Sequence, residues 1–148
     1  MGQSGQNRDP EIGATPVRSG KIKWIIVILL LLFAAVAAMN LPRGYSDDLS
    51  RIGKGHPVVV IVRDKDSVPS FDLIHVLDGL RGKYDGKVEF LLTEFNTPEG
   101  RAFIAVNHAA PATLVLIDAG GKTVKVLNAP QTAENVRQEI ANALGVTP

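Results

Sequence analysis

The sequence predicts an α/β domain with the element order β-α-β-α-β-β-α, preceded by one transmembrane helix. The domain begins with Pro57 and five β-branched residues, a run typical of a strand that is buried on both faces. A polar loop and a helix start follow this strand, and the same succession recurs at Thr97-Pro98-Glu99. An uncharged apolar run from Trp24 to Leu41 precedes the domain.

The apolar run indicates a membrane-spanning helix over residues 21–41. Its uncharged part would reach about 27 Å as a helix, close to the thickness of a bilayer's hydrocarbon core. Trp24 stands where an interfacial aromatic residue is expected, and Lys21 and Lys23 would extend toward lipid headgroups. The lipid bilayer is therefore a predicted partner. Residues 1–20 are rich in Gly, Ser, Gln and Asn, which predicts a disordered tail.

Basic residues near the helix predict its orientation. Arg18, Lys21 and Lys23 precede the run, whereas Arg43 alone follows it closely. The positive-inside rule then places the N-terminus in the cytoplasm and the C-terminal domain outside the cell membrane, in the periplasm if the cell is Gram-negative. The alternative is a cleaved signal peptide ending at the small-x-small site of residues 35–37. The long preceding flank and the continued apolar run favour an uncleaved single-pass anchor.

Residues 42–55 are predicted to form a linker, and residues 56–148 the domain. Strands are predicted at 57–62, 87–93, 113–118 and 123–127, with helices near 69–81, 98–108 and 132–144. The first of these helices is expected to be amphipathic, with one apolar side made of Phe71, Ile74, Leu77 and Leu80. Because helices join the first three strands, these strands are predicted to be parallel, and the turn at 119–122 makes the fourth antiparallel.

Composition excludes several kinds of chemistry. The 148 residues include no cysteine, so disulfides, thiolate catalysis and cysteine-metal sites are excluded. The 16 basic and 15 acidic residues nearly balance, which does not favour a nucleic-acid partner. No phosphate-binding motif is present, and the sequence predicts neither a cofactor nor a small-molecule substrate.

Four segments of the domain carry a family resemblance: Pro57-Val58-Val59-Val60, Ser67-Val68-Pro69-Ser70, residues 93–99, and Ala110-Pro111-Ala112-Thr113 with the strand that follows. In this order and spacing, residues 56–145 resemble the thioredoxin-like superfamily. The resemblance implies a thioredoxin-like fold and puts Ser67-Val68-Pro69-Ser70 where the family has the redox motif Cys-x-Pro-Cys. Because serine cannot form a disulfide, the resemblance predicts a redox-inactive domain that is not an enzyme.

The family's cis-proline loop corresponds to residues around Pro111. A gapless alignment back from Asp118 puts Ala112 at the cis-proline position, whereas one extra residue before the strand puts Pro111 there. Both alignments stay open, and so does a cis peptide bond before Pro111.

The sequence gives little support for catalysis or metal binding by the serine, histidine and aspartate residues. Ser67 or Ser70 with His108 would make a nucleophile and a base, but no third orienting group is evident and serines at a helix start usually serve as caps. The acidic loop at 64–66 lacks the ligands and the glycine of a calcium site. Three histidines on separate predicted elements are more typical of surface residues than of metal ligands: His56, His75 and His108. No catalytic or metal residue is predicted.

In thioredoxin-like proteins, the region around the redox motif and the proline loop also holds extended polypeptides. Here the resemblance implies a partner-binding face made of Asp66, Ser67, Val68, Pro69, Ala109, Ala110, Pro111 and Ala112. The sequence therefore predicts a protein-binding, scaffolding or assembly module, or an accessory subunit of a membrane complex, with other envelope or membrane proteins as partners. The alternative is an envelope protein that retains a thiol-pathway or metal-handling role.

Overall fold

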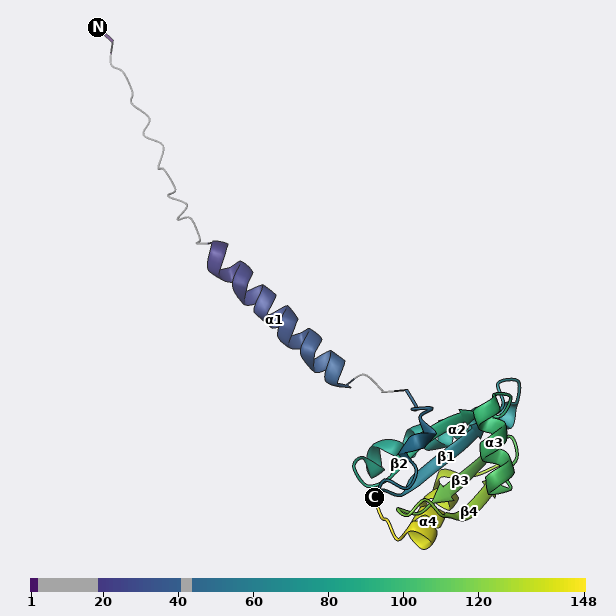
Figure 1. Cartoon of the computed structure of the whole chain (residues 1–148). Coiled ribbons are helices and arrows are strands. Elements are labelled where there is room, and N and C mark those ends of the chain that lie inside the picture. Colours follow the sequence, from purple (N-terminus) through teal and green to yellow (C-terminus); the bar gives the residue numbers. More distant parts are fainter. Residues whose placement is uncertain (3–18, 41–43) are drawn as a thin grey trace. The chain divides into compact units, whose positions relative to one another are not determined.

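The computed structural model describes residues 1–2, 19–40 and 44–148, and the chain divides into two compact units, Met1–Arg43 and Gly44–Pro148 (Figure 1). Most of the predicted N-terminal tail, residues 3–18, lies outside the described residues.

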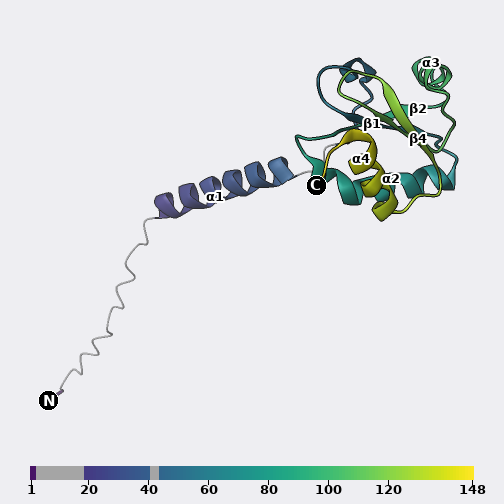
Figure 2. The ribbon, with the colours of Figure 1, turned by 90° about the horizontal axis from the view of Figure 1, so that it is seen from below.

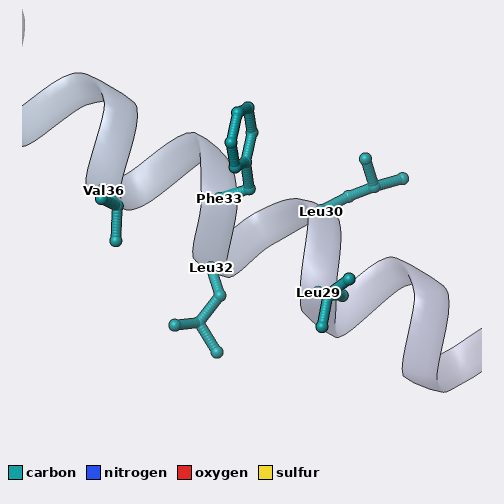
Figure 3. Close-up of a pocket in the computed structure, with 5 residues that line it drawn as sticks. All are labelled: Leu29, Leu30, Leu32, Phe33 and Val36. Atoms are coloured by element: carbon teal, nitrogen blue, oxygen red, sulfur yellow. The ribbon is translucent and has the colours of Figure 1, made fainter.

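The first unit contains one long helix, α1 (Ser19–Asn40). Its described side chains, from residue 23 to residue 37, are all exposed. Figure 3 shows five of them projecting from different sides of α1 around a shallow apolar depression: Leu29, Leu30, Leu32, Phe33 and Val36. Leu41, the end of the predicted membrane span, lies outside the described residues. Within the described residues, no helix combines the length and the apolar character needed to cross a bilayer.

The second unit has a mixed α/β fold built on a four-stranded sheet, and three of the four α-helices within the described residues belong to it. Its elements are, in chain order, η1 (Leu49–Arg51), β1 (Val58–Arg63), α2 (Val68–Arg81), η2 (Gly82–Tyr84), β2 (Glu89–Glu94), α3 (Pro98–Asn107), β3 (Thr113–Ile117), β4 (Thr123–Asn128) and α4 (Ala133–Leu144). The predicted order β-α-β-α-β-β-α is confirmed.

The strands lie in the order β2-β1-β3-β4. β1 and β2 are parallel, and β4 is antiparallel to β3, as predicted. The prediction that β3 is parallel to β1 was wrong: the two strands are antiparallel, with Val62 opposite Thr113. The reason is the course of α3, which Figure 2 shows end-on while α2 is seen along its length. Because α3 lies across the strands, it leaves the chain at the edge where β1 and β2 end, so β3 must run back.

The sheet has one hydrophobic core on each face (Figure 2). Helices α2 and α4 cover one face and bury side chains such as Leu77 and Ile140 against Val59 and Ile61. Helix α3 covers the other face, where Phe103 packs with Val60 and other side chains that point the opposite way. The continuous apolar run of β1 is explained by this burial on both faces.

Residues 44–55, predicted to be a linker, pack onto the second unit. Tyr45 contacts the core beneath α2, and Leu49 and Ile52 contact the core beneath α3. Ser46 forms a parallel bridge with Leu91 of β2. The folded unit accordingly begins at Gly44 rather than at the predicted His56. The polar and glycine-rich composition of this segment led to the linker prediction, although three of its side chains reach the cores.

The predicted helix boundaries are mostly confirmed. The Thr97 hydroxyl accepts from the Gly100 N–H at 3.0 Å, and the Thr132 hydroxyl accepts from the Asn135 N–H at 3.2 Å. Gly145 ends α4 with a φ of 68°, a left-handed conformation that glycine adopts without strain.

Candidate functional site

Two segments of the predicted binding face meet at the edge of the sheet where β1 ends. The Val62 carbonyl accepts a hydrogen bond from the Ala112 N–H at 2.9 Å, which ties the 109–112 loop to the strand that leads into the 64–67 loop. The Ala112 carbonyl in turn accepts from the Ala129 N–H at 3.0 Å. Ala129 and the exposed Pro130 therefore join this edge. Sequence reasoning missed them, although a proline directly after β4 marks where that strand ends.

The degenerate motif forms the start of α2. Ser67 occupies the N-cap position, but its side chain makes no capping hydrogen bond, contrary to the usual role of a serine there. Pro69 lies in the first turn, as predicted. Ser70 is fully buried, and its hydroxyl accepts from the Asp64 N–H at 3.0 Å. The two serines thus differ. The buried Ser70 hydroxyl holds the loop before α2 through its hydrogen bond with Asp64, whereas Ser67 contributes its backbone carbonyl to the first turn of α2.

Few backbone N–H groups at the start of α2 are free to bind a partner. The Ser67 carbonyl accepts from the N–H groups of Ser70 at 3.1 Å and Phe71 at 3.4 Å. Pro69 has no N–H group. Among helix residues 68–71, only the N–H of Val68 has no partner in the structure. The helix start is consequently not the row of free donors that an uncapped helix would offer.

The outer surface of this edge is apolar. Val68 is 70% exposed and Phe71 is 47% exposed. The prediction that Phe71 lies on the same side of the helix as Leu77 was wrong, because α2 instead buries Leu73, Leu77 and Leu80. Several smaller residues of the predicted face complete the patch: Pro69, Ala110 and Pro111 are exposed, whereas Ala109 and Ala112 are half-buried. We call the exposed residues Val68, Pro69, Phe71, Ala110 and Pro111 the apolar edge.

The 109–112 loop has a distinctive backbone. His108 ends α3 with a φ of 51°, and Ala112 has a φ of 59°, a conformation that is uncommon for a residue other than glycine. The Ala110 carbonyl accepts from the Thr113 hydroxyl at 2.7 Å. The peptide bond before Pro111 is trans, and the cis peptide bond in the described residues is Ala129–Pro130.

Charged side chains surround the apolar edge. Arg63 and Glu94 face each other at the ends of β1 and β2 and form an ion pair, and the Lys65 amine lies 4.0 Å from the same Glu94 carboxylate. By contrast, Asp66 and Asp72 are exposed and Asp64 is half-buried. Within the described residues, none of these three aspartates forms an ion pair. An uncompensated negative charge therefore borders the patch.

The residues considered for catalysis and metal binding form no catalytic pair or metal-binding group within the described residues. His56, His75 and His108 are all exposed, and no hydrogen bond joins His108 to Ser67 or Ser70 in the part of the chain that the structure describes. No group of side chains among the described residues is arranged to hold a metal ion. The 64–66 loop is a local turn in which the Asp64 carboxylate accepts from the Asp66 N–H at 3.1 Å.

No known protein family matches the chain, and no curated protein matches it.

Proposed function

We propose that the chain is a membrane-anchored, extracytoplasmic, thioredoxin-like domain without redox activity that binds other membrane or envelope proteins through its apolar edge. One observation carries the proposal: the hydrogen bond from Ala112 to Val62 holds the 109–112 loop beside the segment leading into α2. Two loops held at one edge of a sheet, outside the end of a strand, form the usual place for a binding site in open α/β sheets.

The exposed side chains support a role in protein binding. Val68 and Phe71 expose large apolar surfaces, and the rigid Pro69 and Pro111 lie in the first turn of α2 and in the 109–112 loop. Apolar side chains exposed beside one another cost free energy in water and often mark interaction sites. The backbone that carries them is fixed by the Ser70–Asp64 and Ala112–Val62 hydrogen bonds, so little conformational entropy would be lost on binding.

The lack of cysteine bears on activity. A thioredoxin-like reductase needs two thiols, and here the corresponding positions are Ser67 and Ser70. Ser70 is buried and hydrogen-bonded inward, so it is not presented to a substrate. For the alternative of a thiol-pathway or metal-handling protein, no supporting arrangement of side chains occurs among the described residues, and this alternative is not favoured.

Membrane anchoring is supported by the sequence run from Trp24 to Leu41 together with the exposure of its described part. The consecutive apolar side chains from Trp24 to Phe33, which together cover every side of α1, are exposed. A helix that is apolar around its whole circumference is stable when lipid or protein covers it. The basic residues before the run favour a cytoplasmic N-terminus.

The anchor is tested by washing membranes from expressing cells with alkaline carbonate. We expect the full-length chain to stay in the membrane pellet. A soluble mature form beginning near Ala38 would instead establish the signal-peptide alternative.

The binding face is tested with Val68→Asp. Because Val68 is 70% exposed, the substitution should leave the thermal unfolding temperature nearly unchanged. We expect it to weaken partner binding by about 1–3 kcal/mol if Val68 lies near the centre of the interface. The measurement is quantitative co-purification of crosslinked partners with the full chain, and Val106→Asp on the exposed surface of α3 is the matched control. Equal recovery of every partner by a folded Val68→Asp protein would exclude the apolar edge.

A further inference from the structure

The backbone of the apolar edge has few free hydrogen-bonding groups, so it is poorly suited to pair with the backbone of a partner strand. The Ala112 N–H and carbonyl are both used within the domain, as are the Ala110 carbonyl and the Ser67 N–H. Pro69 and Pro111 offer no N–H group. A partner strand would accordingly find few of the alternating donors and acceptors that strand addition requires.

Side chains must then supply the recognition, and the two exposed charged residues that flank Val68 most closely without an ion-pair partner, Asp66 and Asp72, are both acidic. Asp72 lies one helical turn after Val68, and Asp66 lies two residues before it. Both carboxylates are exposed and form no ion pair within the described residues. The nearest basic side chain in sequence, Lys65, has its amine 4.0 Å from Glu94, which already pairs with Arg63.

Resting on the proposed function, we infer that the partner segment at the apolar edge carries an apolar anchor flanked by lysine or arginine and binds through side chains. The anchor would cover Val68 and Phe71, while the flanking cations face Asp66 and Asp72. Complementary charges of this kind raise the association rate and select among partners. The same carboxylates would repel anionic lipid headgroups, so a protein segment is the favoured occupant rather than the membrane surface.

Carboxylates near a helix start also have a plain structural role, because they stabilise the helix dipole. Asp66 lies just before α2, where this effect operates. Thermal unfolding separates the two roles, since a purely structural role changes the unfolding temperature and leaves the charge preference of binding unchanged.

The test uses the full chain in non-ionic detergent micelles and two fluorescein-labelled peptides. Both peptides have a central Leu-Leu pair, which is flanked by lysines in one and by glutamates in the other. Fluorescence anisotropy is expected to show tighter binding of the lysine peptide. The double variant Asp66→Asn/Asp72→Asn should weaken that binding about fivefold at low salt, and high salt should remove most of the difference. The control Asp47→Asn/Asp85→Asn makes the same charge change at exposed sites elsewhere and should leave binding unchanged.

Equal binding of the two peptides, or equal loss of binding in the two double variants, would overturn the charge inference. The separate Val68→Asp co-purification decides whether the apolar edge binds protein at all. If Val68→Asp lowers partner recovery while the lysine peptide has no advantage, the proposed function stands and this inference fails. If Val68→Asp leaves partner recovery unchanged, the proposed function is excluded, and this inference, which rests on it, is excluded as well.

Discussion

The buried Ser70 hydroxyl accepts a hydrogen bond from the Asp64 N–H at 3.0 Å, which joins the first turn of α2 to the loop before it. The half-buried Ser67, three residues earlier, makes no side-chain capping bond. Two serines that look equivalent in sequence therefore have different structural roles, and this difference is open to measurement.

Ser70→Ala is expected to lower the free energy of unfolding by about 1–3 kcal/mol, because it leaves the Asp64 N–H without its partner. Ser67→Ala is the matched control and should change stability by less than about 0.5 kcal/mol. Urea unfolding of the full chain in micelles, followed by circular dichroism, measures both. A larger loss for Ser67→Ala than for Ser70→Ala would contradict the hydrogen-bond assignment.

Gly100→Ala should destabilise the domain strongly. An added Cβ at this buried position in α3 would lie 1.8 Å from the Glu94 carbonyl oxygen, so the helix would have to move away from the end of β2. We expect a loss of about 2 kcal/mol or more. The same substitution at Gly79, in α2, meets no atom within 4 Å and should raise stability by about 0.5–1 kcal/mol. Equal effects of the two substitutions in urea unfolding would show that α3 can shift at little cost.

Tyr45→Phe tests how tightly residues 44–55 are held. The Tyr45 hydroxyl donates to the Asp78 carboxylate at 2.8 Å, and the Arg81 guanidinium lies 4.9 Å from the centre of the tyrosine ring. Burial, followed by the bond to Asp78, raises the pKa of Tyr45 above its ordinary value of about 10. The folded state thus keeps the phenol proton at pH values where the unfolded state loses it, and stability falls as the pH rises above about 10.

The variant lacks this ionisation, so the stability advantage of the wild type over Tyr45→Phe should be constant below about pH 9 and should shrink above about pH 10. Below that range we expect the advantage to be about 1 kcal/mol, the usual net contribution of one hydrogen bond. Paired urea titrations of the two proteins at each pH measure the difference and cancel the titration of groups that they share. An advantage that stays constant through alkaline pH would mean that Tyr45 is exposed to solvent in the folded chain.

Much of the domain is predictable because local signals set its elements. The apolar run of β1, the threonine caps at Thr97 and Thr132 and the glycine after α4 mark boundaries that the structure reproduces. The direction of β3 is not predictable in this way. It depends on how α3 crosses the sheet, which is a matter of tertiary packing: Phe103 of α3 belongs to a core shared with side chains of β1, β2 and β3, and no local signal encodes it.

The candidate site was likewise only partly predictable from the sequence, because it too depends on tertiary packing. The 64–67 and 109–112 segments share an edge because β3 runs antiparallel to β1, which brings the start of β3 beside the end of β1, and the Val62–Ala112 bond joins them there. The predicted parallel β3 would have placed the two segments at opposite ends of the sheet. The exposure of Phe71 was missed because apolar residues repeated at every third position do not stay on one helix face. With 3.6 residues per turn, Phe71 lies roughly 120° around the helix from the buried Leu77.

The packing of residues 44–55 has a consequence for where proteolysis can cut the chain and leave the second unit whole. A protease that cut within this segment would separate the domain from Tyr45, Leu49 or Ile52, side chains that fill both cores. It would also remove the Ser46 strand pairing and the ion pair between Arg51 and Glu89. The second unit therefore keeps all of its packing only if the chain is cut before Gly44, and a fragment that begins further along lacks part of both cores.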